Sequence, residues 1–213
     1  MPSFPKSVRE MANALGPKVR EAYALANKVH AGEKRRSGEP YITHPVAVAR
    51  MLFEAGADAD IVCAALLHDT LEGNGASEQI RAEIYRKFGG QVLYLVEALS
   101  KDIRLEDKIE QQAVYIEQIQ RALQVDIFVF FIKIADITHN MSTIHGLRRK
   151  RKLQWLHELR GQYLPLFSEY LHRIPLAHRA LYHQMMDQIE RLLTAHDGSR
   201  TPAEHAMLPP THD

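Results

Sequence analysis

The chain has little cysteine and little net charge. Cys63 is the single thiol in 213 residues, so no disulfide can form within the chain. It lies in an apolar stretch, which is typical of a buried structural thiol. Lysine and arginine (27) nearly balance aspartate and glutamate (26), which gives a formal charge of +1. This balance excludes a general electrostatic binder of nucleic acids or membranes.

Long hydrophobic runs, repeats and low-complexity tracts are also missing. No apolar stretch approaches the length of about 20 residues that a membrane-spanning helix needs. Residues 1–6 lack the apolar centre of a secretory signal, and we expect a cytoplasmic protein. From Ala195 onward the chain has three prolines and few large apolar residues. We therefore expect one domain over residues 1–194 and a mobile tail over residues 195–213.

Apolar residues instead recur at three- and four-residue steps, the period of an α-helix. This pattern predicts helices over residues 17–31, 43–56, 77–88, 91–99, 106–123 and 175–193, and again from Leu147. Residues 61–67 are apolar on all sides, and residues 127–141 are apolar except for a few polar positions, which predicts two buried helices. No hairpin signal separates alternating runs. We expect an all-α bundle of about eight to ten helices.

The first buried stretch ends in three polar residues, His68, Asp69 and Glu72. If its helix continues to the glycines at 73 and 75, His68 and Glu72 share a face. An imidazole beside a carboxylate offers nitrogen and oxygen ligands to a divalent metal. The alternative is a helix end where His68 contacts the last carbonyls and Asp69 caps the next turn.

The second buried stretch carries Lys133, Asp136 and Asn140 at helical spacing, so the three share one face. Burying them costs several kcal/mol unless they meet partners. A functional site explains this placement, and the alternative is a structural salt bridge between Asp136 and Lys133.

A third segment leads into the helix after residue 42. Thr43 is a favourable N-cap and Pro45 suits the first turn, which places His44 at the helix mouth. His44 is then either a surface histidine or a metal ligand facing His68. The preceding loop, residues 33–42, is rich in basic and turn-forming residues. It is either a solvated loop or one whose guanidinium groups contact phosphate and stack on flat rings.

The basic run at residues 148–152 offers a similar choice between a solvated helix face and a position near an anionic ligand. Trp155, a few residues later, is expected in the core.

Three ordered motifs together resemble the hydrolase domain of the RelA/SpoT-type alarmone enzymes, a branch of the HD phosphohydrolase superfamily. They are residues 35–45 (RRSGEPYITHP), 66–72 (LLHDTLE) and 133–141 (KIADITHNM). The resemblance covers about Ala22 to Ile144 and implies an HD-type helical bundle. Because the chain has no room for the synthetase and regulatory domains of the long enzymes, we expect a stand-alone small alarmone hydrolase.

The resemblance implies hydrolysis of the 3′-diphosphate of guanosine tetra- or pentaphosphate with Mn²⁺, releasing pyrophosphate and GDP or GTP. Glu72 stands at the position of the catalytic glutamate. The implied metal ligands are His44, His68, Asp69 and Asp136. The implied substrate contacts are Arg35, Arg36, Ser37, Lys133 and Asn140.

Three positions depart from the family pattern. Gly73 stands where an aspartate usually follows the glutamate, and Ile137 and Ser142 stand where basic residues are common. Two alternatives follow: an HD phosphohydrolase acting on another nucleotide or phosphoester, and a catalytically weak nucleotide-binding module. The expected partner is a small nucleotide substrate, and neither nucleic acid nor a membrane. For the alarmone hydrolase, the sequence leaves open whether its base is guanine or adenine.

Overall fold

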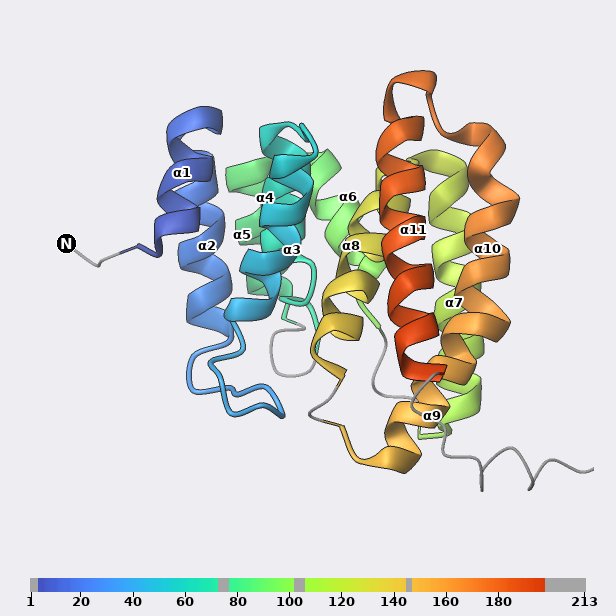
Figure 1. The fold of residues 1–213 in the computed structure, drawn as a ribbon. Helices are drawn as coiled ribbons and strands as arrows, with labels where there is room; N and C mark the ends of the chain where they lie inside the picture. The colour runs from blue at the N-terminus through green and yellow to red at the C-terminus, as the bar shows by residue number, and fades with distance from the viewer. Residues whose placement is uncertain (1–3, 73–76, 102–105, 145–146, 198–213) are drawn as a thin grey trace, which may run out of the picture.

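A computed structural model describes residues 4–72, 77–101, 106–144 and 147–197, and these residues form a bundle of α-helices (Figure 1). The helices are α1 (Lys6–Leu15), α2 (Lys18–Val29), α3 (Thr43–Glu54), α4 (Ala59–Leu67), α5 (Glu78–Phe88), α6 (Gly90–Leu99), α7 (Lys108–Val125), α8 (Phe128–Ser142), α9 (Arg149–Glu158), α10 (Leu164–Glu169) and α11 (Leu176–Asp197). A π-helical turn, Leu159–Tyr163, joins α9 to α10 without a break. The all-α class is confirmed, since the only β-pairing among these residues is an isolated bridge between Lys34 and Pro40.

The two apolar stretches are buried helices, as their composition predicts. Every residue of α4 from Ile61 to Leu67 is at most 1% exposed. α4 packs against α2, α3, α6 and α8. α8 lies between the N-terminal helices and α7 and α11, and contacts both sides (Figure 1). The meeting of α3, α4 and α8 therefore lies deep in the bundle.

Several helix ends differ from the sequence-based expectation. α4 ends at Leu67, so Glu72 lies in a turn and does not share a helical face with His68. Thr43 does not cap α3, because Ile42 precedes the helix and the Thr43 hydroxyl donates to the carbonyl of Pro40. α1 was not predicted from the sequence. Its buried face consists of Val8, Met11 and Ala12.

The last helix extends beyond the predicted start of the tail. α11 continues to Asp197, so residues 195–197 are helical, whereas the sequence pattern predicted a helix that ends at residue 193. Residues 198–213 of the predicted tail, and the predicted helix stop at residues 73–75, lie outside the described residues. Within the described part of the chain, no helix combines the length and apolarity needed to cross a membrane.

Because α4 is buried, shortening one of its side chains should lower the stability of the fold substantially. Leu66 is fully buried, and we expect Leu66→Ala to lower the free energy of unfolding by about 2–5 kcal/mol. Leu176→Ala is the matched control, because that leucine is 80% exposed and its loss should cost less than about 0.5 kcal/mol. Urea denaturation of both variants measures the difference. Similar small effects in both would contradict a core position for α4.

Candidate metal centre and its adjoining cavities

His68 holds a free lone pair at the end of α4. Its backbone angles are still helical (φ −57°, ψ −30°), which turns the side chain back toward the helix. Its Nδ1 donates to the carbonyl of Ala65 at 2.8 Å, so Nε2 carries the lone pair. Nε2 is buried and has no hydrogen-bond partner among the described residues. An orphaned imidazole nitrogen of this kind suits a metal ion.

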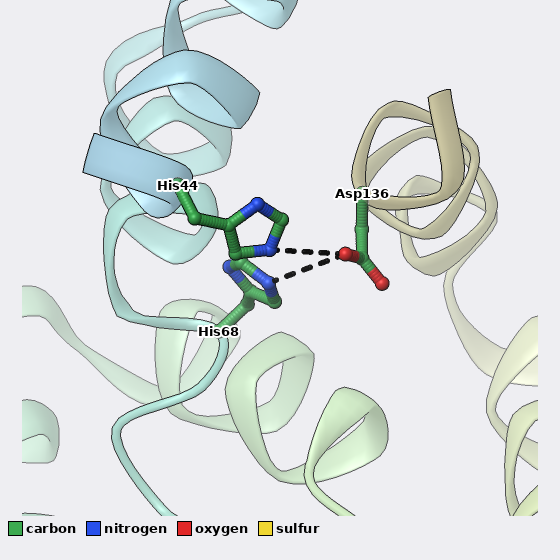
Figure 2. Close-up of side chains that lie close together, drawn as sticks. All are labelled: His44, His68 and Asp136. Carbon is green, nitrogen blue, oxygen red and sulfur yellow. Dashed lines mark ion pairs between the residues drawn. The ribbon is translucent and has the colours of Figure 1, made fainter. Parts of the chain in front are cut away.

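Two further donors meet His68 from other helices (Figure 2). Nε2 of His44, in the first turn of α3, lies 3.1 Å from Oδ1 of Asp136 in α8. Nε2 of His68 lies 3.9 Å from the same oxygen. One ligand atom from each of these three buried side chains lies within 4.8 Å of the other two. Two imidazoles and a carboxylate are ligands for a divalent transition metal.

Asp69 lies beside this group. Its Oδ1 is 3.2 Å from Nε2 of His68, and its Oδ2 is 3.7 Å from Nε2 of His44. The hydroxyl of Tyr41 donates to Oδ2 at 2.7 Å. Among the described residues, the set of mutually close donors contains Asp136 and the two histidines but not Asp69. The role of Asp69 as a fourth ligand therefore stays a prediction.

The carboxylates of the group are ionised because positive charge surrounds them. Burial would raise the pKa of Asp136, but Lys133 and the two histidines outweigh it and hold that pKa well below its ordinary value. Burial likewise opposes ionisation of Asp69, and His68 and His44 lower its pKa. In turn, the carboxylates raise the pKa of His68 against the effect of burial. A bound cation would supply the same compensation.

Lys133 and Asn140 both contact Asp136, as their shared face predicts. Nζ of Lys133 lies 2.9 Å from Oδ2, and Nδ2 of Asn140 donates to Oδ1 at 2.6 Å. Nζ of Lys133 also donates to the hydroxyl of Tyr115 at 3.2 Å. The salt bridge considered as the alternative is thus present, and it coexists with the contacts of Asp136 to the histidines.

Glu72 enters the same cavity from the turn after α4. Its Oε1 accepts a hydrogen bond from the backbone N–H of Lys101 at 2.8 Å. Burial, and then the charge of Asp69, raises the pKa of Glu72 to about 7. A carboxyl group with this pKa can exchange a proton near neutral pH.

The metal donors open into a cavity of about 280 Å³ that is lined by several cations. Lys133 comes from α8, Lys101 follows α6, and Arg151 comes from the basic run in α9. Ile137 and Ser142, where the resemblance led us to expect basic residues, add no positive charge to this cavity. Ile137 is buried, and the hydroxyl of Ser142 donates to the carbonyl of His139. Positive charge thus reaches the cavity from other segments.

A second cavity of about 470 Å³ adjoins the first and shares Tyr41, Asn140, Arg151 and Trp155 with it. Arg35, Arg36 and Ser37 of the basic loop line this second cavity. Arg35 is half-buried and donates to Oδ1 of Asn140 at 3.1 Å and to the hydroxyl of Thr143 at 3.0 Å. Trp155, expected in the core, is half-buried and forms a wall common to both cavities.

Comparison with known proteins identifies the family to which this chain belongs. The family model described as the HD domain matches residues 22–169, most of the chain. This chain belongs to the HD domain family. The three sequence motifs resemble the same superfamily, and the relatives below confirm the resemblance to RelA/SpoT-type alarmone enzymes.

Three relatives illustrate what this HD domain is similar to. It is 40% identical to the bifunctional (p)ppGpp synthase/hydrolase SpoT of Escherichia coli strain K12 over 177 residues, 82% of this chain and 23% of SpoT. It is 37% identical to the guanosine-3′,5′-bis(diphosphate) 3′-pyrophosphohydrolase of Vibrio cholerae over 176 residues, 82% of this chain and 23% of that protein. It is 36% identical to the GTP pyrophosphokinase of Streptomyces coelicolor over 185 residues, 82% of this chain and 21% of that protein.

The HD domain thus spans less than a quarter of the length of these curated relatives. Among solved structures, it matches a metazoan ortholog of SpoT that is described as hydrolysing ppGpp. The TM-score is 0.64 and the identity 21%, with 88% of this chain and 98% of that chain covered. At this identity the match supports the fold of the HD domain.

Sequence reasoning missed four residues of the HD domain site: Tyr41, Lys101, His139 and Trp155. Tyr41 stands inside a quoted motif, and His139 follows Asp136 by three residues, so the helical period could have found it. Nδ1 of His139 lies 2.8 Å from Nδ1 of His44. Burial, His44 and Arg35 lower the pKa of His139 to about 4. Lys101 had no signal in the sequence.

The raised pKa of Glu72 predicts a pH dependence of stability in the metal-free HD domain. The folded state keeps this carboxyl protonated up to a pKa of about 7, whereas the unfolded chain loses the proton near its ordinary value of 4.5. The resulting stabilisation is fully present below pH 4.5 and is lost as the pH rises through 7. Glu72→Gln stays neutral at every pH, so its stability relative to wild type should rise by about 3 kcal/mol between pH 4.5 and 8.

Chemical denaturation of both proteins in EDTA at several pH values measures this difference. Glu78→Gln is the matched control, because the Glu78 side chain is 90% exposed and should give no trend. A constant difference between wild type and Glu72→Gln across this range would contradict burial of Glu72 as an acid.

Proposed function

We propose that this HD domain uses Mn²⁺ to hydrolyse the 3′-diphosphate of guanosine tetra- or pentaphosphate, releasing pyrophosphate and GDP or GTP. The observation that carries the proposal is the position of a buried histidine–carboxylate group in a cavity lined by cations, next to a second cavity lined by a basic loop. The names of the relatives, a (p)ppGpp synthase/hydrolase and a guanosine-3′,5′-bis(diphosphate) 3′-pyrophosphohydrolase, support the choice of substrate.

The proposed metal ligands are His44, His68 and Asp136, with Asp69 as the fourth. The orphaned Nε2 of His68 and the mixed nitrogen and oxygen donors support this assignment. Imidazole and carboxylate ligands with open positions suit Mn²⁺. When bound, Mn²⁺ would lower the pKa of water and stabilise negative charge on the phosphate oxygens.

Glu72 is the proposed general base. It takes a proton from the water that attacks the phosphorus next to the ribose, and the bond between this phosphorus and the 3′-oxygen breaks. The proton taken up by Glu72 returns to the 3′-oxygen, directly or through solvent, so this oxygen stays on the nucleoside as a hydroxyl and the water oxygen leaves on pyrophosphate. A pKa of about 7 lets Glu72 accept the proton near neutral pH. The Lys101 N–H fixes the carboxyl group in place.

The cations of the first cavity are proposed to bind the diphosphate. Lys133 is a cation despite its burial, because Asp136 raises its pKa well above the ordinary value. Lys101 and Arg151 line the wall of the same cavity. Charge-assisted hydrogen bonds to phosphate are strong, and guanidinium groups can form two of them in parallel.

The second cavity is proposed to hold the nucleoside. Arg35 presents a planar guanidinium that Asn140 and Thr143 hold in place, and a planar cation stacks well on a purine ring. Arg36 and Ser37 are exposed on the same loop and can reach the sugar and its 5′-phosphates. Guanine is proposed over adenine because the relatives are named for guanosine nucleotides.

An activity panel tests the proposed reaction. With Mn²⁺, the wild-type protein should release pyrophosphate from guanosine tetraphosphate, and ordinary mononucleotides should remain intact. Glu72→Gln should bind Mn²⁺ like wild type but lower kcat by at least about 100-fold, because the base is lost. Glu78→Gln, an exposed glutamate outside the site, is the control.

The same panel separates the alternatives. Phosphate release from mononucleotides would support a phosphohydrolase with another substrate, and adenosine tetraphosphate reports the purine preference. Tight nucleotide binding without turnover would support a binding module and contradict the proposed activity. Unchanged turnover in Glu72→Gln would exclude Glu72 as the base.

The assignment of Asp69 can be tested by metal binding alone. Asp69→Ala should weaken Mn²⁺ binding by more than about 100-fold, since loss of a ligand should cost more than the 10- to 100-fold cost of losing a supporting residue. Isothermal titration calorimetry on metal-stripped protein measures the dissociation constant. Asp187→Ala on the surface of α11 serves as the control. Wild-type affinity in Asp69→Ala would remove Asp69 from the ligand set.

A further inference from the structure

We propose that His139 is a positioning residue of the metal centre, whose Nδ1 accepts the Nδ1 proton of His44 and thereby keeps the Nε2 lone pair of His44 directed at the metal. The inference rests on the metal centre of the proposed function. It adds a residue that the motif assignment left without a role.

The direction of the hydrogen bond follows from what each nitrogen faces. Nδ1 of His44 and Nδ1 of His139 lie 2.8 Å apart, a distance at which one nitrogen must donate and the other accept. Nε2 of His44 faces Asp136 at 3.1 Å and Asp69 at 3.7 Å, on the side of the proposed metal. When the metal is bound, Nε2 must present a lone pair to it, and this requires the proton of neutral His44 to be on Nδ1. His139 is then the acceptor.

His68 shows the same arrangement with a different acceptor. Its Nδ1 donates to the carbonyl of Ala65, one helical turn before it, and its Nε2 is left free. Both metal histidines would thus have their Nδ1 protons held by acceptors fixed on buried helices. A backbone carbonyl serves His68, and a second imidazole serves His44, which begins a helix and has no preceding helical turn of its own.

The position of His139 on α8 suits it to orient the imidazole of His44. It follows Asp136 by three residues, so one helix carries a metal carboxylate and, one turn later, the group that orients an opposing histidine. The hydroxyls of Ser142 and Thr143 donate to the carbonyl of His139 and stabilise this last turn. The ring centroids of His44 and His139 lie 4.9 Å apart, with an angle of 36° between the ring planes.

Two substitutions at residue 139 separate hydrogen bonding from packing. His139→Asn keeps an acceptor close to the position of Nδ1, whereas His139→Leu keeps an apolar side chain of similar bulk and removes the acceptor. We expect His139→Leu to weaken Mn²⁺ binding by about 10- to 100-fold and His139→Asn to stay near the wild-type affinity. Calorimetric titration of metal-stripped protein measures both dissociation constants without substrate.

Activity provides a second readout. The turnover of His139→Leu should be low at limiting Mn²⁺ and should recover as the Mn²⁺ concentration is raised, because the catalytic residues are intact. His172→Leu is the matched control, since His172 is exposed and its Nδ1 donates to the carbonyl of Glu169 outside the site. It should leave Mn²⁺ binding unchanged.

Each failure points to a different error. If wild type does not bind Mn²⁺, the proposed metal centre is wrong. If wild type binds and His139→Leu binds equally well, or if the Leu and Asn variants lose affinity equally, the positioning role of His139 is wrong. Should His139→Leu fail to fold, side-chain ¹⁵N NMR of the wild type with diamagnetic Zn²⁺, which accepts imidazole ligands, decides. A protonated Nδ1 on His44 and a bare Nδ1 on His139 support the proposal, and the reverse overturns it.

Discussion

Asp136 is a buried carboxylate, and its need for partners organises the site. An unpaired charge at this depth would cost several kcal/mol. Lys133 and Asn140 supply contacts from the same helix, and His44 approaches from the start of α3. These contacts lie where α3 and α8 meet near the end of α4. The partners that compensate the charge of Asp136 therefore lie at the junction of three packed helices.

The ion pair of Asp136 with Lys133 compensates the buried carboxylate from within its own helix. Lys133 contacts Oδ2, while Oδ1 faces the histidines and also accepts a hydrogen bond from Asn140. The salt bridge keeps Asp136 ionised and ready to bind a cation. It also reduces the negative charge of the donor set, which favours a metal bound by imidazoles over a hard cation held by carboxylates alone.

The sequence predicted contacts along one helix and missed contacts between loops. The shared face of Lys133, Asp136 and Asn140 followed from the helical period, because neighbours at three and four residues depend on nothing else. The helical period did not predict where α4 ends. The N–H of Thr70 donates to the carbonyl of Leu67, three residues back, so the helix ends before Glu72. The Lys101 contact to Glu72 depends on how distant segments pack, which no local pattern encodes.

The basic loop and the metal centre form one connected network. Asn140 accepts from Arg35 through Oδ1 and donates to Asp136 through Nδ2, so a single amide joins the guanidinium of the loop to a metal carboxylate. Tyr41, at the end of the same loop, donates to Asp69. The loop therefore reaches both carboxylates, Asp136 through Arg35 and Asn140, and Asp69 through Tyr41. If the loop binds the nucleoside as proposed, these hydrogen bonds connect substrate recognition to the carboxylates of the candidate metal centre, because Asn140 contacts both Arg35 and Asp136 and Tyr41 contacts Asp69.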